Sequence, residues 1–131
     1  MNFADFVHVA ETTKTFDEAV VSVLNAADKK GWAIFQIYDV KERLAAKGFS
    51  QQPLKIIEIC SAKYANNFLN KNRFSSICMP CKINVMQENE TVKIVAMKPT
   101  MVSSFFPEIR QSEAAEAEKD VKEIISEAAK K

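Results

Sequence analysis

Three residue types are scarce in this chain of 131 residues, which has one histidine, two glycines and four prolines. No Ser/His/Asp arrangement is recognisable around the single histidine, His8, near the N-terminus. Glycines only at positions 31 and 48 exclude the glycine-rich loops that bind nucleotide phosphates. The sequence therefore contains no recognisable catalytic constellation, and enzyme activity is not predicted.

An excess of one charge and long apolar runs are missing as well. Eighteen basic and 17 acidic side chains leave a formal charge of +1, so no long-range field attracts nucleic acid or an anionic membrane. No apolar stretch approaches the roughly 20 residues that span a bilayer, and the N-terminus lacks the pattern of a signal peptide. Three cysteines, an odd number, argue against a secreted disulfide scaffold. We expect a cytoplasmic protein with no nucleic-acid or membrane partner.

What the chain does contain is enough apolar material for one core. The hydrophobic fraction is 47%, and the length is typical of one domain over residues 1–131. Thr15 and Glu18 form a capping box before a helical apolar pattern that ends at Gly31. Asp39 and Glu42 form a second such signal before a short helix.

Alternating apolar residues predict the strands. Residues 32–38 are apolar on both faces, which is typical of an interior strand. Residues 82–87 and 92–96 alternate on either side of a short polar turn and predict a hairpin. From about Ser112 the chain turns helical, with one apolar stripe made of Ala117, Val121, Ile124, Ile125 and Ala128. The element order β-α-β-α-β-α-β-β-α predicts a two-layer α+β fold, with a mostly antiparallel five-stranded sheet and helices mainly on one face.

Between about residues 11 and 128 the sequence resembles domain-of-unknown-function family 302, a group of small bacterial and archaeal proteins. The segments that carry the resemblance are Thr15 to Val20, Asp39-Val40-Lys41 with Gly48, Cys60 with Ala65 and Leu69, Pro80-Cys81, and Pro99 with Met101. The resemblance implies the same α+β fold and a tendency to form homodimers. The family's name assigns no biochemical role.

Cys60 and Cys81 are the candidate site residues. Cys60 ends an apolar run and precedes a helical stretch, where a helix N-terminus favours a thiolate. Cys81 opens the next strand, so both cysteines lie at strand ends, where loops gather. They also match the family pattern, which favours a ligand-binding or reactive pair. The alternative is that Cys60 packs in the core, since free cysteine is among the most buried residue types.

Cys78 and Cys81 have the spacing of a redox dithiol or of half a zinc site. A redox motif of this kind opens a helix, whereas here a strand follows. A structural zinc site needs four ligands, and this chain has three cysteines and a distant His8. We predict no metal site, and the sequence identifies no cofactor.

The sequence supports one main hypothesis and two alternatives. The main hypothesis is a cytoplasmic homodimeric domain that binds a small ligand in a pocket or cleft near Cys60 and Cys81. An apolar dimer face or a pliable pocket would use a group of apolar side chains late in the chain, Met79, Met86, Met97, Met101, Phe105 and Phe106. The alternatives are a thiol-dependent redox or sulfur-transfer protein with Cys60 as nucleophile, and a non-catalytic protein-interaction module.

Overall fold

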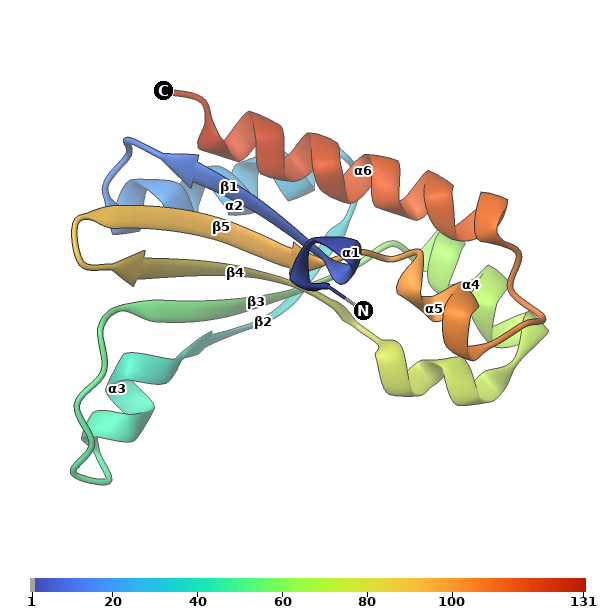
Figure 1. The fold of residues 1–131 in the computed structure, drawn as a ribbon, viewed down its shortest axis with the longest axis horizontal. Coiled ribbons are helices and arrows are strands. Elements are labelled where there is room, and N and C mark those ends of the chain that lie inside the picture. The colour runs from blue at the N-terminus through green and yellow to red at the C-terminus, as the bar shows by residue number, and fades with distance from the viewer. Residues whose placement is uncertain (1) are drawn as a thin grey trace.

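The computed structural model describes residues 2–131 and forms one five-stranded antiparallel sheet with helices (Figure 1). The strands are β1 (Val7–Thr12), β2 (Ala33–Asp39), β3 (Leu54–Cys60), β4 (Cys81–Glu88) and β5 (Thr91–Met97), in the sheet order β1-β5-β4-β3-β2. The helices are α1 (Phe3–Phe6), α2 (Phe16–Lys29), α3 (Val40–Ala45), α4 (Ala62–Lys71), α5 (Met101–Phe105) and α6 (Gln111–Ala129), with a 3-10 helix, η1 (Arg73–Cys78), before β4. The predicted α+β fold is confirmed, and α1, η1 and α5 are additions to the predicted order.

Helices α2 and α6 lie side by side on one face of the sheet (Figure 1). The capping box before α2 is present: Thr15 Oγ1 accepts from the Glu18 N–H, and the Glu18 carboxylate accepts from the Thr15 N–H. Gly31 ends this helix with φ of +83°, a left-handed conformation that glycine adopts without strain. All five residues of the predicted apolar stripe of α6 are buried. Neither α6, at 19 residues, nor any other described helix is long and apolar enough to cross a membrane.

The core lies between these two helices and the three inner strands. Alternate residues of these strands point toward α2 and α6 and are fully buried: Ile57, Ile59, Ile83, Val85 and Ile94. The residues between them, such as Lys82, Asn84 and Met86 on β4, point to the opposite face. In the described part of the chain no long helix packs on that face (Figure 1). The sheet is therefore covered on one face and largely open on the other.

Strand β2 is at the edge of the sheet, so the prediction that residues 32–38 form an interior strand is wrong. It pairs only with β3, and its residues Ala33 to Ile37 are all exposed. The exposed fractions of Ile34, Phe35 and Ile37 are 36%, 58% and 40%. Apolar residues on both faces usually mean that both faces are covered, yet these three side chains stay more than one-third exposed in the described part of the chain.

The sequence from Ser61 to about Leu69 predicts a helix with Ala62, Ala65 and Leu69 facing inward, and the apolar face of α4 differs from this prediction. The notable buried side chain of α4 is Phe68, whereas Leu69 is half-buried and Ala62 is exposed. Residues 70–80 show no regular pattern and predict an irregular link. In the structure the helix runs to Lys71 and is followed by η1. This arrangement places α4 and η1 beside the ends of β3 and β4, where Cys60 and Cys81 lie.

Candidate functional site: a cavity lined by three cysteines

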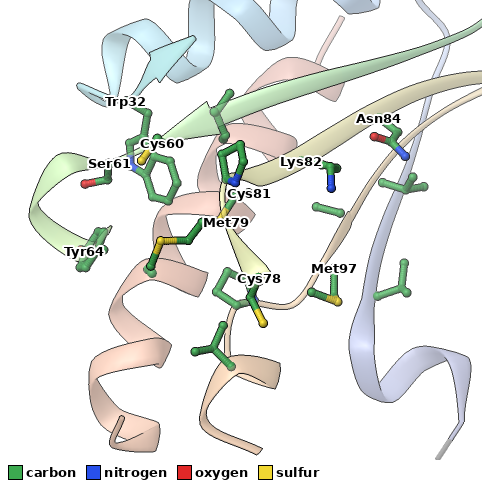
Figure 2. Close-up of a pocket in the computed structure, with 18 of the residues that line it drawn as sticks. Trp32, Cys60, Ser61, Tyr64, Cys78, Met79, Cys81, Lys82, Asn84 and Met97 are labelled. Carbon is green, nitrogen blue, oxygen red and sulfur yellow. The ribbon is translucent and has the colours of Figure 1, made fainter. Parts of the chain in front are cut away.

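A cavity of about 670 Å³ lies at the junction of the open sheet face with α4 and η1. This volume is within the range of small-molecule sites, roughly 300–1,000 Å³. Its walls are contributed by β1, β3, β4, β5, α4 and η1, and most of the lining side chains are apolar. The three cysteines of the chain all line it (Figure 2).

Aromatic side chains form one end of the cavity. The Trp32 ring is only 4% exposed, and its Nε1–H donates to Asp120 Oδ2 at 3.0 Å. The ring centroids of Trp32 and Tyr64 are 6.0 Å apart, and Cys60 and Ser61 lie beside them (Figure 2). Because the hydrogen bond to α6 fixes the indole, this end of the cavity is preformed.

The three thiols are placed by consecutive elements. Cys60 is the last residue of β3, Cys78 ends η1 and Cys81 begins β4, paired with Ile59 of β3. Burial raises the pKa of the Cys60 and Cys78 thiols. For Cys81, burial and the neighbouring thiols Cys60 and Cys78 raise the pKa to about 11, although Lys82 opposes this. For Cys60 the raised pKa is opposite in direction to the effect that the following helix N-terminus alone predicts, and its cause is burial.

Polar side chains occupy another part of the cavity, where Lys82 and Asn84 project from the same face of β4 (Figure 2). The Oδ1 atom of Asn84 is buried and has no hydrogen-bond partner among the described residues. Glu88 and Lys93 also line the cavity, but they pair with each other, with 2.8 Å between Oε1 and Nζ. The cavity thus combines an apolar, thiol-rich end with a few polar groups.

The lining of the cavity is mainly apolar and rich in sulfur. Among residues 2–131 no three His, Cys, Asp or Glu side chains gather closely enough to hold a metal ion. Apolar walls, thiols and the thioethers of Met79, Met86 and Met97 offer a polarisable surface that adapts to a ligand's shape.

The histidine lies outside this cavity. His8 of β1 has its Nε2 3.6 Å from Glu118 Oε2 on α6, and burial lowers the pKa of His8. Burial raises the pKa of Glu118, but hydrogen bonds from Thr100 and the charges of His8 and Lys122 hold it below its ordinary value. These contacts join β1 to α6, and they assign His8 a place in the packing between the sheet and that helix.

Sequence reasoning found part of the cavity. Cys60 and Cys81, predicted as a pair, both line the cavity. Cys78 lines it as well, although it was not predicted as a site residue. It missed Trp32, Tyr64, Lys82 and Asn84. The alternation of Cys81 to Met86 places Lys82 and Asn84 on one face and was the available signal. Nothing local in the sequence joins Trp32 to Tyr64, because they come from different segments.

Together, these observations describe an α+β domain with a cavity of about 670 Å³, lined by three cysteines, beside one open sheet face. The chain belongs to the family described as domain of unknown function DUF302, whose model matches residues 8–128. Its structure is similar to the crystal structure of an uncharacterised conserved DUF302 protein from Bacillus stearothermophilus, with a TM-score of 0.88 and 27% sequence identity. That likeness covers 95% of this chain and 98% of the other. No curated protein sequence matches this chain significantly.

Proposed function

We propose that this chain is a homodimeric, cytoplasmic binding domain whose cavity at Cys60 and Cys81 holds a small, largely apolar ligand. The observation that carries the proposal is the cavity itself, about 670 Å³ with mostly apolar walls and a fixed indole at one end. Large apolar cavities with a few polar groups are typical of small-molecule sites. The cytoplasmic location is supported by three cysteines that are all free thiols.

The thiol chemistry favours binding over nucleophilic catalysis. A nucleophilic cysteine needs a lowered pKa, which a nearby cation or a base provides. Burial instead raises the pKa of all three thiols, and His8 is not among the residues that line the cavity. We therefore assign Cys60 and Cys81 to the ligand surface and not to a reaction.

The single tryptophan of the chain provides a direct test of the cavity. We expect 1-octanol, a neutral apolar probe, to change the fluorescence of Trp32 with saturation, because the indole lines the cavity. Ala65→Phe places a ring in the cavity and should weaken octanol binding at least tenfold. Asn66→Phe adds the same ring at an exposed neighbouring position on α4 and should leave binding unchanged.

Two results would contradict the cavity proposal. One is a wild-type protein whose Trp32 emission shows no saturable change with octanol. The other is equal octanol binding by Ala65→Phe and the wild type while both variants melt at the wild-type temperature, since the ligand would then bind elsewhere.

The homodimer is supported by the edge strand β2. Residues 33–38 carry no charged side chain and no proline, which are the usual protections of an exposed edge. Three large apolar side chains project from β2, on both faces of the sheet. Antiparallel pairing of β2 with the same strand of a second copy is self-complementary about a two-fold axis and would pack these side chains against those of the second strand.

This interface differs from the apolar group that the sequence favoured. Met101 is buried and Phe106 is half-buried. The thioethers of Met79, Met86 and Met97 line the cavity. Phe105 is the remaining member of that group; its side chain lies outside the cavity and is 62% exposed. The structure therefore supports the pocket use of the methionines, and we place the dimer contact at β2.

Sedimentation velocity at micromolar concentration distinguishes a dimer contact at β2 from one at Phe105. The wild type should sediment with twice the chain mass of 14.7 kDa. Phe35→Lys should shift the protein to the monomer, because a charge would then lie in the β2 interface. Phe105→Lys, an equally exposed phenylalanine on α5, should remain dimeric. A monomeric wild type, or dissociation by Phe105→Lys alone, would refute the β2 dimer.

A further inference from the structure

We propose that the ligand of this cavity is a single-chain amphiphile with an anionic head group, such as a medium-chain carboxylate, whose head contacts Lys82 and Asn84 and whose apolar part reaches toward Trp32 and Tyr64. This inference rests on the proposed binding function and names the chemical class of its ligand. It follows from the distribution of charge and of apolar surface within the one cavity.

The charges of the cavity favour an anion. Three charged residues line it, Lys82, Glu88 and Lys93. Glu88 and Lys93 neutralise each other at 2.8 Å. No carboxylate oxygen among residues 2–131 lies within 4.0 Å of the Lys82 ammonium. Lys82 is an exposed residue at the cavity and, among the described residues that line it, the charged one without a paired partner, so it favours an anionic head group at the solvent-facing part of the cavity.

The nearest candidate partner of Lys82 is engaged elsewhere. Glu58 lies directly opposite Lys82 in the β3–β4 pairing. Its Oε1 accepts a hydrogen bond from the Tyr38 hydroxyl at 3.0 Å, and Glu58 does not line the cavity. Because Tyr38 holds this carboxylate toward β2, Lys82 is available to a bound anion.

Asn84 adds a second polar contact next to Lys82. The two residues are two positions apart on β4, so their side chains project from the same face and can contact one head group. The amide of Asn84 has a buried Oδ1 without a partner, which is costly unless something bound in the cavity satisfies it. A carboxylate only accepts hydrogen bonds, so it accepts from the Lys82 ammonium and from Asn84 Nδ2, whereas Asn84 Oδ1 accepts from a water held beside the head group.

The remaining space defines the rest of the ligand. Trp32 and Tyr64 lie on the side of the cavity away from Lys82 and Asn84, with Met79 and Cys81 between them (Figure 2). Among the described residues, the charged side chains that line the cavity are Lys82, Glu88 and Lys93. A polar tail that enters the apolar end would therefore lose its hydration without replacement. An unbranched or aromatic apolar tail fits this stretch, and its burial stabilises the complex.

A matched series of eight-carbon probes tests the class of ligand through Trp32 fluorescence. We expect octanoate to bind at least tenfold more tightly than 1-octanol, and octylammonium to bind more weakly than 1-octanol. Lys82→Met keeps a side chain of similar length without the charge. It should lower octanoate affinity about tenfold, to the level of octanol, and leave octanol affinity unchanged. Lys119→Met, on the exposed surface of α6, should leave both the octanoate and the octanol affinity unchanged.

The outcomes separate this inference from the proposed function. Equal binding of octanoate, octanol and octylammonium would overturn the anionic class while the cavity stays a binding site. An octanoate preference that survives in Lys82→Met would overturn the assignment of the head group to Lys82. Failure of all three probes to bind would overturn the proposed function together with this inference.

Discussion

Truncation after Arg110 is expected to abolish cooperative folding, because it removes α6. Six side chains of that helix are buried: Ala114, Ala117, Val121, Ile124, Ile125 and Ala128. The three larger ones alone contribute about 1.5–3 kcal/mol each on burial. Together they stabilise by an amount comparable with the whole unfolding free energy of a small domain, about 5–15 kcal/mol. The truncated chain should show no sigmoidal thermal transition by circular dichroism.

The matched control for this truncation removes only Lys130 and Lys131, which are exposed and lie beyond the end of α6. That chain retains the buried stripe and should melt within a few degrees of the full chain. If the chain truncated after Arg110 melted at the same temperature as the full chain, α6 would not belong to the core.

Cys81 is expected to alkylate roughly 100-fold more slowly at pH 7 in the folded protein than in the unfolded chain. The thiolate is the reactive form, and burial raises the pKa of Cys81 from 9.0 to about 11. At pH 7 the folded protein therefore holds far less Cys81 thiolate. The rate should rise about tenfold for each pH unit between 7 and 10, because the thiolate fraction rises in that proportion.

Iodoacetamide labelling followed by peptide mass spectrometry measures the alkylation rate of each thiol separately. The same protein unfolded in urea is the reference. Cys60 and Cys78, whose pKa values burial also raises, should be slower in the folded than in the unfolded chain. Labelling of folded Cys60 faster than that of a free cysteine at pH 7 would favour the thiol-dependent alternative over the binding domain.

The parts of the fold that the sequence predicts well depend on local signals. The capping box of Thr15 and Glu18, the turn between β4 and β5, and the buried stripe of α6 are set by residues close together in the chain. Side-chain identity within a few residues determines these features, so they can be read before the tertiary structure is known.

The wrong predictions concern β2 and α4, where tertiary or quaternary contacts determine which side chains are buried. The both-sided apolar pattern of β2 indicates that both faces are covered, but it does not say whether the cover belongs to the same chain. The structure places β2 at the edge, where the proposed dimer would give its apolar side chains neighbours from the second copy. In α4, Phe68 is buried in place of Ala62 because the helix packs at the end of the sheet and not across its face.

The candidate site could be predicted only in part for the same reason. Two of its thiols were identified because they stand at strand ends, which the sequence shows. Trp32, Tyr64 and Lys82 come from three separate segments, and only the sheet and α4 bring them to one cavity.

Native mass spectrometry of the full chain with octanoate tests the central claim most directly, since it counts chains and ligands in one spectrum. The account predicts a species of two chains carrying two octanoate molecules, one for each cavity. It also predicts loss of the octanoate from Ala65→Phe while that variant stays dimeric. A spectrum in which the wild-type chain carries no octanoate, or carries the same number as Ala65→Phe, would contradict the claim that this cavity is the binding site.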